Sequence, residues 1–173
     1  MKFHFACVLV CILLAASIPA HANQWDYHTT KDEMTGKKKS FATSPEASPT
    51  KRMGFPYGDV IGWIGFGCDG ESEWVYVGFS ESPNLTNVKP QSGGYSTFST
   101  RIRWDDTIDN ISMSQEWGSK FLHFEFDSVV IEKIMKAGNV LLELSWYSSG
   151  RVYFNFSLNG SSKAIQSARA ACG

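Results

Sequence analysis

Large apolar residues recur at every second position in several parts of this chain, and that spacing constrains the fold more than any other feature. One such row consists of Val152, Phe154, Phe156 and Leu158. A further apolar run covers residues 140–146, and residues 148–150 between the two segments read Ser-Ser-Gly, which favours a tight turn. Because side chains of a β-strand alternate between the two faces of a sheet, this pattern predicts an antiparallel hairpin with one face in the core.

A second hairpin is predicted earlier in the chain. Residues 60–66 and 73–79 are apolar runs, and Asp69-Gly70 between them is a favoured tight-turn pair. In the second run Trp74 and Tyr76 point to one face, and the valines and a phenylalanine point to the other. Both faces are apolar, as is typical of a strand inside a β-sandwich. The glycines of the two runs indicate bulges or close backbone packing.

The rest of the chain supplies shorter elements. Strands are predicted at residues 25–27, around Phe41, at 95–104 and at 120–126, and the Ser-, Pro- and Gly-rich residues 43–58 are predicted to form a loop. Together with the hairpins, this makes six to eight strands.

Two short helices complete the predicted elements. Asp127 or Ser128 can cap the first, which ends before Gly138, and Ser161 or Ser162 can cap the second. We therefore expect a mainly β fold, either an antiparallel β-sandwich or a partly open barrel, with two short helices.

Residues 1–22 are typical of a secretory signal peptide. Lys2 and His4 form a short polar start, and residues 5–18 are apolar but too few to cross a bilayer. Ala20-His21-Ala22 is the small-x-small pattern that signal peptidase cuts. We expect cleavage after Ala22 and one β-rich domain at 23–173. No later run reaches the roughly 20 apolar residues that a spanning helix needs.

An exported chain of this kind could be periplasmic or secreted. Four Asn-x-Ser/Thr sequons would be glycan acceptors in a eukaryotic secretory route, at Asn84, Asn110, Asn155 and Asn159. Two of them lie in or beside a predicted buried strand, where a glycan would oppose folding. The sequence therefore favours a bacterial periplasm.

The cysteines indicate one disulfide bond. Cys7 and Cys11 lie in the predicted signal peptide, which leaves Cys68 and Cys172. An even pair in an exported protein is typical of a disulfide, and no Cys-x-x-Cys spacing indicates a redox role. The bond would tie the turn of the earlier hairpin to the C-terminal helix. In the chain-entropy model it stabilises the fold by on the order of 4 kcal/mol.

Residue types that can act in catalysis are present, but their spacing does not indicate an active site. His28 and His123 are too far apart in sequence for the close-spaced ligand pair that is usual at zinc sites. Asp105-Asp106 could bind a hard cation, yet such a pair after a strand is typical of a turn. Glu125 and Asp127 could flank a glycosidic bond, but no cleft is indicated. We expect no catalytic, cofactor-binding or metal-binding residues, and no enzymatic activity.

Charge and aromatic content point to a binding role. Lys and Arg number 16 against 17 Asp and Glu, so the chain has no general attraction to nucleic acid or to an anionic membrane. Six Trp, six Tyr and twelve Phe exceed what a small core needs. Trp117 lies away from every predicted strand, and Tyr95 follows the polar residues 92–94. An exposed Trp117 would indicate contact with a partner or a saccharide, and its alternative role is a lid over the core. Trp117 and Tyr95 are the candidate partner-binding residues.

Several segments together resemble a known family. They are Arg101-Ile102-Arg103-Trp104-Asp105-Asp106, Glu116-Trp117-Gly118-Ser119, the predicted helix at 129–137, Phe154-Asn155-Phe156-Ser157-Leu158-Asn159-Gly160, Ala164-Ile165 and Cys172. In this order they resemble the VasI-like periplasmic accessory proteins of type VI secretion systems, and related exported proteins of Gram-negative bacteria and their prophages. The opening Trp25-x-Tyr27 is also similar. The resemblance implies a periplasmic β-rich domain with a structural disulfide and no catalytic residues.

Three functions follow as hypotheses. The first is a non-enzymatic interaction domain, such as an accessory of a secretion or envelope system, with another envelope or secreted protein as its partner. The second is an inhibitor of a cell-wall lytic enzyme such as lysozyme, which would use the segment Ser92-Gly93-Gly94-Tyr95 to block its target. The third is a hydrolase that depends on Asp105, Asp106 or Glu125.

Overall fold

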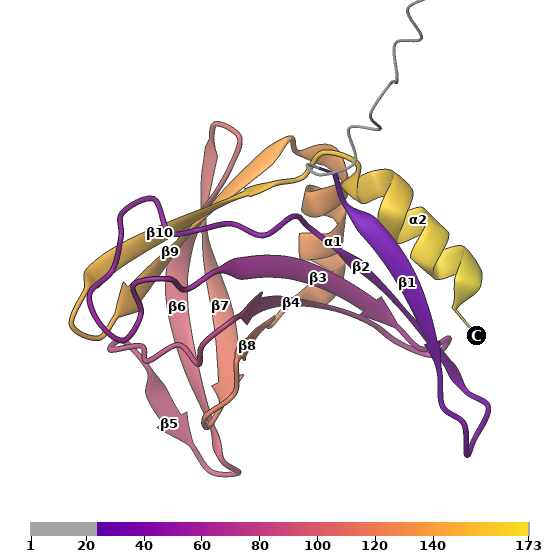
Figure 1. Ribbon diagram of the computed structural model, residues 1–173, viewed down its shortest axis with the longest axis horizontal. Coiled ribbons are helices and arrows are strands. Elements are labelled where there is room, and N and C mark those ends of the chain that lie inside the picture. Colours follow the sequence, from indigo (N-terminus) through magenta and orange to yellow (C-terminus); the bar gives the residue numbers. More distant parts are fainter. Residues whose placement is uncertain (1–23, 173) are drawn as a thin grey trace, which may run out of the picture.

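The computed structural model describes residues 24–172, so the predicted signal peptide at 1–22 lies outside the described residues. Ten strands and two helices make up this part of the chain (Figure 1). They are β1 (Asp26–Lys31), β2 (Lys38–Thr43), β3 (Gly62–Cys68), β4 (Glu73–Phe79), β5 (Lys89–Gln91), β6 (Tyr95–Trp104), β7 (Thr107–Glu116), β8 (Phe121–Phe124), α1 (Asp127–Lys136), β9 (Asn139–Trp146), β10 (Gly150–Ser157) and α2 (Ser161–Ala171).

All ten strands belong to one antiparallel sheet. Its order is β1-β2-β3-β4-β8-β7-β6-β9-β10, and β5 pairs with β6. The sheet curves, so that β10 returns toward β3 and β4 (Figure 1). The ring of Phe79 on β4 lies 5.2 Å from that of Phe154 on β10. The prediction of a mainly β, antiparallel fold with two helices is confirmed, and it takes the form of one curved sheet rather than two stacked sheets.

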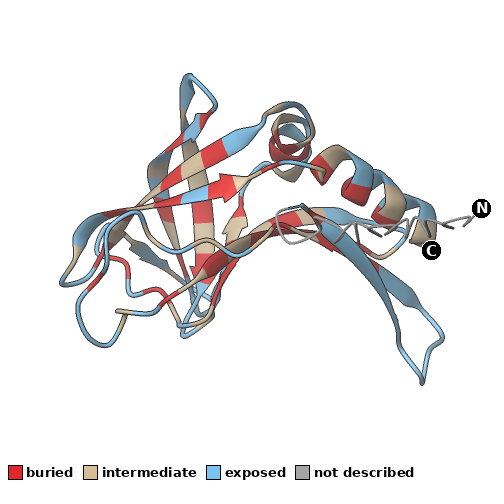
Figure 2. Cartoon of the chain, turned by 45° about the horizontal axis from the view of Figure 1, so that its top comes forward, coloured by how far each residue is buried: buried red, intermediate tan, exposed pale blue. Residues whose placement is uncertain are grey.

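The core lies on the side of the sheet that carries both helices (Figure 2). Trp146, Phe66, Phe79, Phe154 and Phe156 are among its largest fully buried side chains. The predicted inward row along β10 is confirmed, since Val152, Phe154 and Phe156 are all buried there. Burial of this much aromatic surface is the main stabilising contribution to such a fold.

The predicted helix caps are wrong, and Asp127 and Ser161 bind other elements instead. Neither helix has a side-chain hydrogen bond at its N-cap. The Asp127 carboxylate instead accepts the backbone N–H of Val75 at 2.7 Å. The Ser161 hydroxyl donates to the carbonyl oxygen of Ile134 at 2.7 Å. These two bonds join β4 to α1 and α1 to α2.

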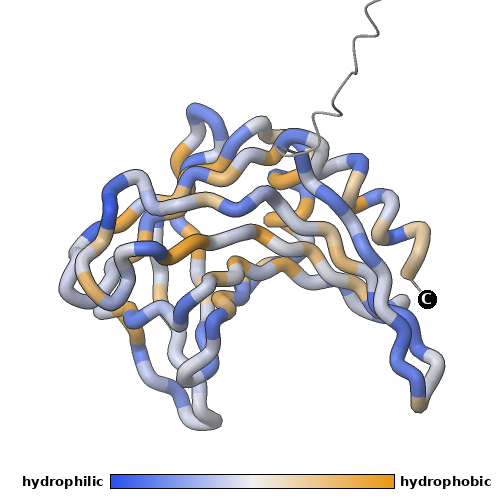
Figure 3. The backbone as a smooth tube through the Cα atoms, viewed as in Figure 1, coloured by the Kyte–Doolittle hydropathy of each residue, from blue (hydrophilic) through white to orange (hydrophobic). Residues whose placement is uncertain are grey.

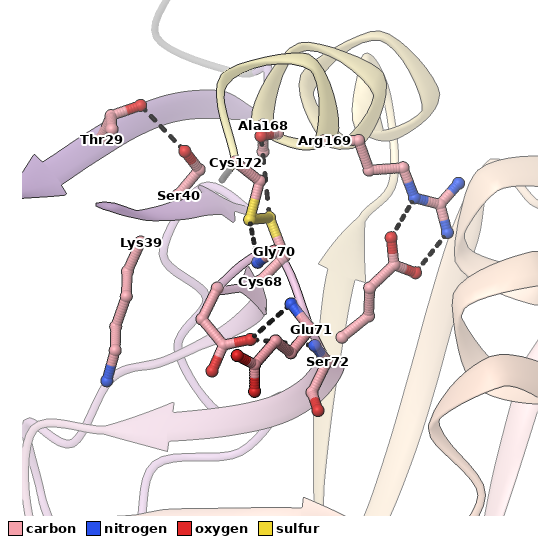
Figure 4. The surroundings of a disulfide bond; sticks show 12 residues. Thr29, Lys39, Ser40, Cys68, Gly70, Glu71, Ser72, Ala168, Arg169 and Cys172 are labelled. Atoms are coloured by element: carbon pink, nitrogen blue, oxygen red, sulfur yellow. Dashed lines mark hydrogen bonds and ion pairs between the residues drawn. A yellow bond between two sulfur atoms is a disulfide. The ribbon is translucent and has the colours of Figure 1, made fainter. Parts of the chain in front are cut away.

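The predicted disulfide is confirmed between Cys68 at the end of β3 and Cys172 after α2 (Figure 4). Their Cα atoms are 6.1 Å apart across a sequence separation of 104 residues. Beside the bond, the guanidinium of Arg169 donates to both carboxylate oxygens of Glu73 at 2.7 Å (Figure 4). The C-terminal helix is therefore attached to the β3–β4 hairpin by one covalent and one ionic contact.

Two strands had no sequence prediction, and the loop predicted at 43–58 overlaps the segment between β2 and β3. The unpredicted strands are β5 and β7. Residues 44–61, between β2 and β3, form no regular strand, although isolated bridges join Ala47 to Gly62 and Pro49 to Phe154. In residues 24–172 no helix combines the length and the apolar character needed to span a membrane. The tip of the β1–β2 hairpin is mostly hydrophilic (Figure 3).

Candidate functional site

In the described residues 24–172, one side of the sheet has aromatic side chains but no helix. Both helices pack on the opposite, core side of the arch that β1–β4 form (Figures 1 and 2). Alternation along each strand places seven rings on the helix-free side, and we call this set the aromatic face: His28, Phe41, Trp63, Trp74, Tyr76, Phe121 and His123. These rings come from five neighbouring strands, so the face extends across the sheet rather than along one strand.

Three glycines lie directly opposite the three largest rings of the aromatic face, those of Trp63, Trp74 and Tyr76. Trp63 pairs with Gly78, and on the same hairpin Tyr76 pairs with Gly65. A Cβ atom on Gly65 would lie 2.2 Å from the Tyr76 ring, and one on Gly78 would lie 2.4 Å from the Trp63 indole. Because real Cβ contacts are never so short, only glycine allows each ring to lie against the backbone of the neighbouring strand.

Trp74 repeats this arrangement one step along the hairpin. It pairs with Gly67, whose Cβ would lie 2.4 Å from the indole. All three rings, Trp63, Trp74 and Tyr76, are partly exposed. Each ring therefore lies against the backbone of the neighbouring strand and keeps part of its surface exposed.

Edge-to-face and stacked contacts connect the smaller rings to the larger ones. Phe121 on β8 meets Tyr76 at 5.4 Å and Trp63 at 6.4 Å, both edge-to-face. Phe41 meets Trp74 edge-on at 6.1 Å, and His28 stacks on Phe41 at 5.3 Å. Such pairs prefer these geometries because of the ring quadrupole, and they hold the rings in defined orientations.

A polar groove continues the aromatic face on the β5–β7 side. It has a volume of about 380 Å³ and is lined mainly by hydroxyl groups and by two opposite charges. The polar residues that line it are Lys89, Tyr95, Thr97, Ser99, Ser112, Ser114 and Glu125. We call it the hydroxyl groove.

Strand register links the aromatic face directly to the hydroxyl groove. Tyr76 is paired with His123, His123 with Ser114, Ser114 with Thr97, and Thr97 with Lys89. Neighbouring strands lie about 4.8 Å apart, so these four steps span about 19 Å. One row of side chains thus passes from an aromatic ring through an imidazole and two hydroxyls to an ammonium group.

Burial raises the pKa of Tyr76 above its usual value of 10.0. The partly buried phenol therefore stays protonated at neutral pH. It offers a neutral ring and a hydroxyl donor, rather than a charge.

The two predicted partner-binding residues lie at one end of the β6–β7 ribbon. Trp117 is 70% exposed and its backbone N–H donates to the carbonyl oxygen of Gly94, while Tyr95 pairs with Glu116. They border different hollows, because Tyr95 lines the hydroxyl groove and Trp117 lines a second hollow of about 370 Å³ beside Pro83 and Leu85. Whether either residue binds a partner stays a prediction.

The acidic residues considered for catalysis make contacts with different elements. Asp105 accepts the backbone N–H groups of Gly138 and Asn139, which makes it a connector between the β6–β7 turn and β9. Asp127 is bound to β4, and Glu125 lines the hydroxyl groove. Within residues 24–172 no group of three or more His, Cys, Asp or Glu side chains could hold a metal ion.

Sequence reasoning placed Trp74 and Tyr76 on one face but did not identify the aromatic face. The missing signal lies in both arms of one hairpin. Trp63-x-Gly65-x-Gly67 runs antiparallel to Trp74-x-Tyr76-x-Gly78, so that every aromatic residue meets a glycine when the arms are aligned. Comparison of the chain with protein-family models, with curated proteins and with solved structures found no match.

Proposed function

We propose that this protein is a non-enzymatic binding domain that holds its partner against the aromatic face and the hydroxyl groove. The observation that carries the proposal is the set of three aromatic–glycine pairs on the β3–β4 hairpin. A glycine weakens a strand unless the position requires one, and here three of them leave room for aromatic rings on the side of the sheet that carries neither α1 nor α2.

The proposal includes the sequence-based expectation of an exported protein that acts in the periplasm or outside the cell. A disulfide is favoured by an oxidising compartment, and Cys68–Cys172 is in keeping with export. An accessory role in a secretion or envelope system, as in VasI-like proteins, is part of the same proposal. Its support is the resemblance described above.

Site-specific photocrosslinking tests the proposed binding face without assuming the class of partner. A photoreactive benzoylphenylalanine would replace Phe121, which is 41% exposed on the aromatic face. The control position is Tyr147, which is 60% exposed in the β9–β10 turn. After irradiation of cells that produce the full chain, we expect a discrete adduct from position 121 and none from position 147. Equal labelling at both positions, or no adduct at 121, would contradict the proposal.

The exposed turn between β5 and β6 favours inhibition of a cell-wall lytic enzyme as a second candidate function. Gly93 and Gly94 both have positive φ, at 106° and 83°, and Ser92, Gly93, Gly94 and Tyr95 are all exposed. A turn of this kind can enter the cleft of an enzyme. Lysozyme assays with and without the purified protein test this function, and an unchanged rate at excess protein would rule lysozyme out as the target.

A further inference from the structure

We infer that the partner of the aromatic face is an uncharged polysaccharide, several sugar rings of which lie across β4, β8, β7 and β6. This inference rests on the proposed function, since it names the chemical class of the ligand for the same surface. It follows from the shape, the charge and the polar groups of that surface.

The shape of the aromatic face suits a flat ligand. Trp63, Trp74 and Tyr76 each lie against a glycine backbone and are partly exposed, which suits ring-face contact better than a pit for a protruding side chain. Ring faces carry the negative part of the aromatic quadrupole. The C–H groups on one face of a pyranose ring carry partial positive charge and form a flat apolar surface, which makes a sugar ring complementary to these side chains.

The charges around the surface fit a neutral ligand. The seven aromatic positions carry no formal charge when both histidines are neutral. The charged side chains at the borders come in opposite signs, with Asp26 and Lys39 on the β1–β2 hairpin and Glu125 and Lys89 at the hydroxyl groove. A nucleic acid or a polyanionic glycan requires a surplus of cations, which this arrangement does not provide.

The polar groups beside the rings fit a ligand with many hydroxyls. Ser114 and Thr97 can both donate and accept, and the imidazole of His123 adds one donor and one acceptor when neutral. Selective sites for small ligands commonly combine apolar surfaces with a few placed polar groups of this type. A row of about 19 Å exceeds one sugar ring, so the ligand is a chain rather than a monosaccharide.

Retention on insoluble polysaccharides tests the inference. Purified protein with its disulfide intact would be incubated with chitin and with cellulose, and its affinity for hexamers of N-acetylglucosamine and of glucose measured by calorimetry. Polygalacturonate serves as the anionic comparison. We expect binding to at least one of the two neutral polymers and its hexamer, and no binding to polygalacturonate.

Variants of the aromatic face connect this binding to named residues. Trp74→Ala should weaken the affinity for the bound hexamer at least tenfold, and Trp74→Phe should weaken it less because a ring remains. Tyr147→Ala removes an exposed ring elsewhere and should leave the affinity unchanged. Thermal unfolding identifies any variant that has lost its fold. If Trp74→Ala does not fold, Trp74→Phe still tests the contribution of the Trp74 ring.

The outcomes separate this inference from the proposed function. If neither polymer retains the protein while the crosslinker at position 121 still forms an adduct with a protein, the polysaccharide inference is wrong and the binding face stands. Absence of both polymer binding and adduct overturns both. Binding that Trp74→Ala leaves intact, in a folded variant, also overturns the inference.

Discussion

Trp63 and Gly78 stand directly opposite each other on β3 and β4, and the indole occupies the space that a side chain at Gly78 would need. The same arrangement occurs in the opposite direction along the hairpin, where Tyr76 and Trp74 on β4 lie over Gly65 and Gly67 on β3. Aromatic residues placed across from glycines are known to offset the loss of strand stability that a glycine causes. The same contact therefore stabilises the hairpin and builds the aromatic face.

Gly78→Ala is expected to lower the free energy of unfolding by about 1–3 kcal/mol, the usual cost of inserting an atom into a filled space. The added Cβ would lie 2.4 Å from Trp63 Cε2 and would force the indole away from the sheet. Urea unfolding measures the change. Gly54→Ala is the matched control, because a Cβ there meets no atom within 4 Å.

The same contact predicts a coupling between the two positions. In a Trp63→Ala background, Gly78→Ala should cost much less, because the indole with which its Cβ collides is gone. Equal costs in both backgrounds would show that the glycine is needed for a reason other than the ring.

Cys68→Ser and Cys172→Ser are expected to lower the melting temperature by similar amounts, and the double variant should add little to either. Each single change removes the same cross-link across 104 residues, which typically contributes about 2–4 kcal/mol. Thermal unfolding of the three variants measures the effect. Clearly unequal single effects, or a free thiol detected in the wild-type protein, would contradict a purely structural bond.

The sequence predicted those strands whose own residues alternate strongly between apolar and polar or lie beside a turn motif. The β9–β10 hairpin and the β3–β4 hairpin both combine strong alternation with a turn motif, and both are confirmed. Strand β7 has no such evidence, because over its ten residues only Met113 and Gln115 are buried. β7 is held in the sheet by pairing with β6 along the full length of both strands. That pairing cannot be recognised from the residues of β7 alone.

The candidate site was missed for a related reason. Apolar residues on both faces of residues 73–79 predicted a strand inside a sandwich. Instead the rings of Trp74 and Tyr76 are partly covered by the glycines of their own sheet. Cross-strand contacts of this kind depend on the register between two strands, which alternation within one strand does not reveal.

Ser161→Ala is expected to destabilise the protein by about 1–2 kcal/mol, whereas Ser162→Ala should have little effect. The Ser161 hydroxyl is buried and donates to the Ile134 carbonyl at 2.7 Å, so its loss leaves a buried acceptor of α1 without that partner. Ser162 bonds only to Gln166, at an exposed position of α2. Denaturant unfolding of both variants distinguishes this inter-helix contact from the N-cap role that the sequence predicted, in which either serine could act.

Asp127 and Glu143 should give opposite pH dependences when each is replaced by its amide. Burial raises the pKa of Asp127 above its ordinary value of 3.8, against smaller opposing effects of the Val75 N–H and of His123. Since the folded state then holds this proton more tightly than the unfolded state, ionisation of Asp127 costs stability as the pH rises through that raised pKa. Asp127→Asn avoids this cost. Its stability relative to wild type should therefore increase from pH values below 3.8 to neutral pH.

Glu143 provides the opposite sign, because the hydrogen bonds and charge of Arg101 lower the pKa of its carboxyl below the ordinary 4.5. Its ionised form stabilises the folded state above the unfolded-state pKa, and this contribution is lost as the pH falls through the lowered value. Glu143→Gln should therefore lose stability relative to wild type as the pH rises to neutral. Urea midpoints of both variants and wild type across this pH range measure the two slopes. Slopes of the same sign would contradict the assignment of burial as the dominant influence on Asp127 and of Arg101 as that on Glu143.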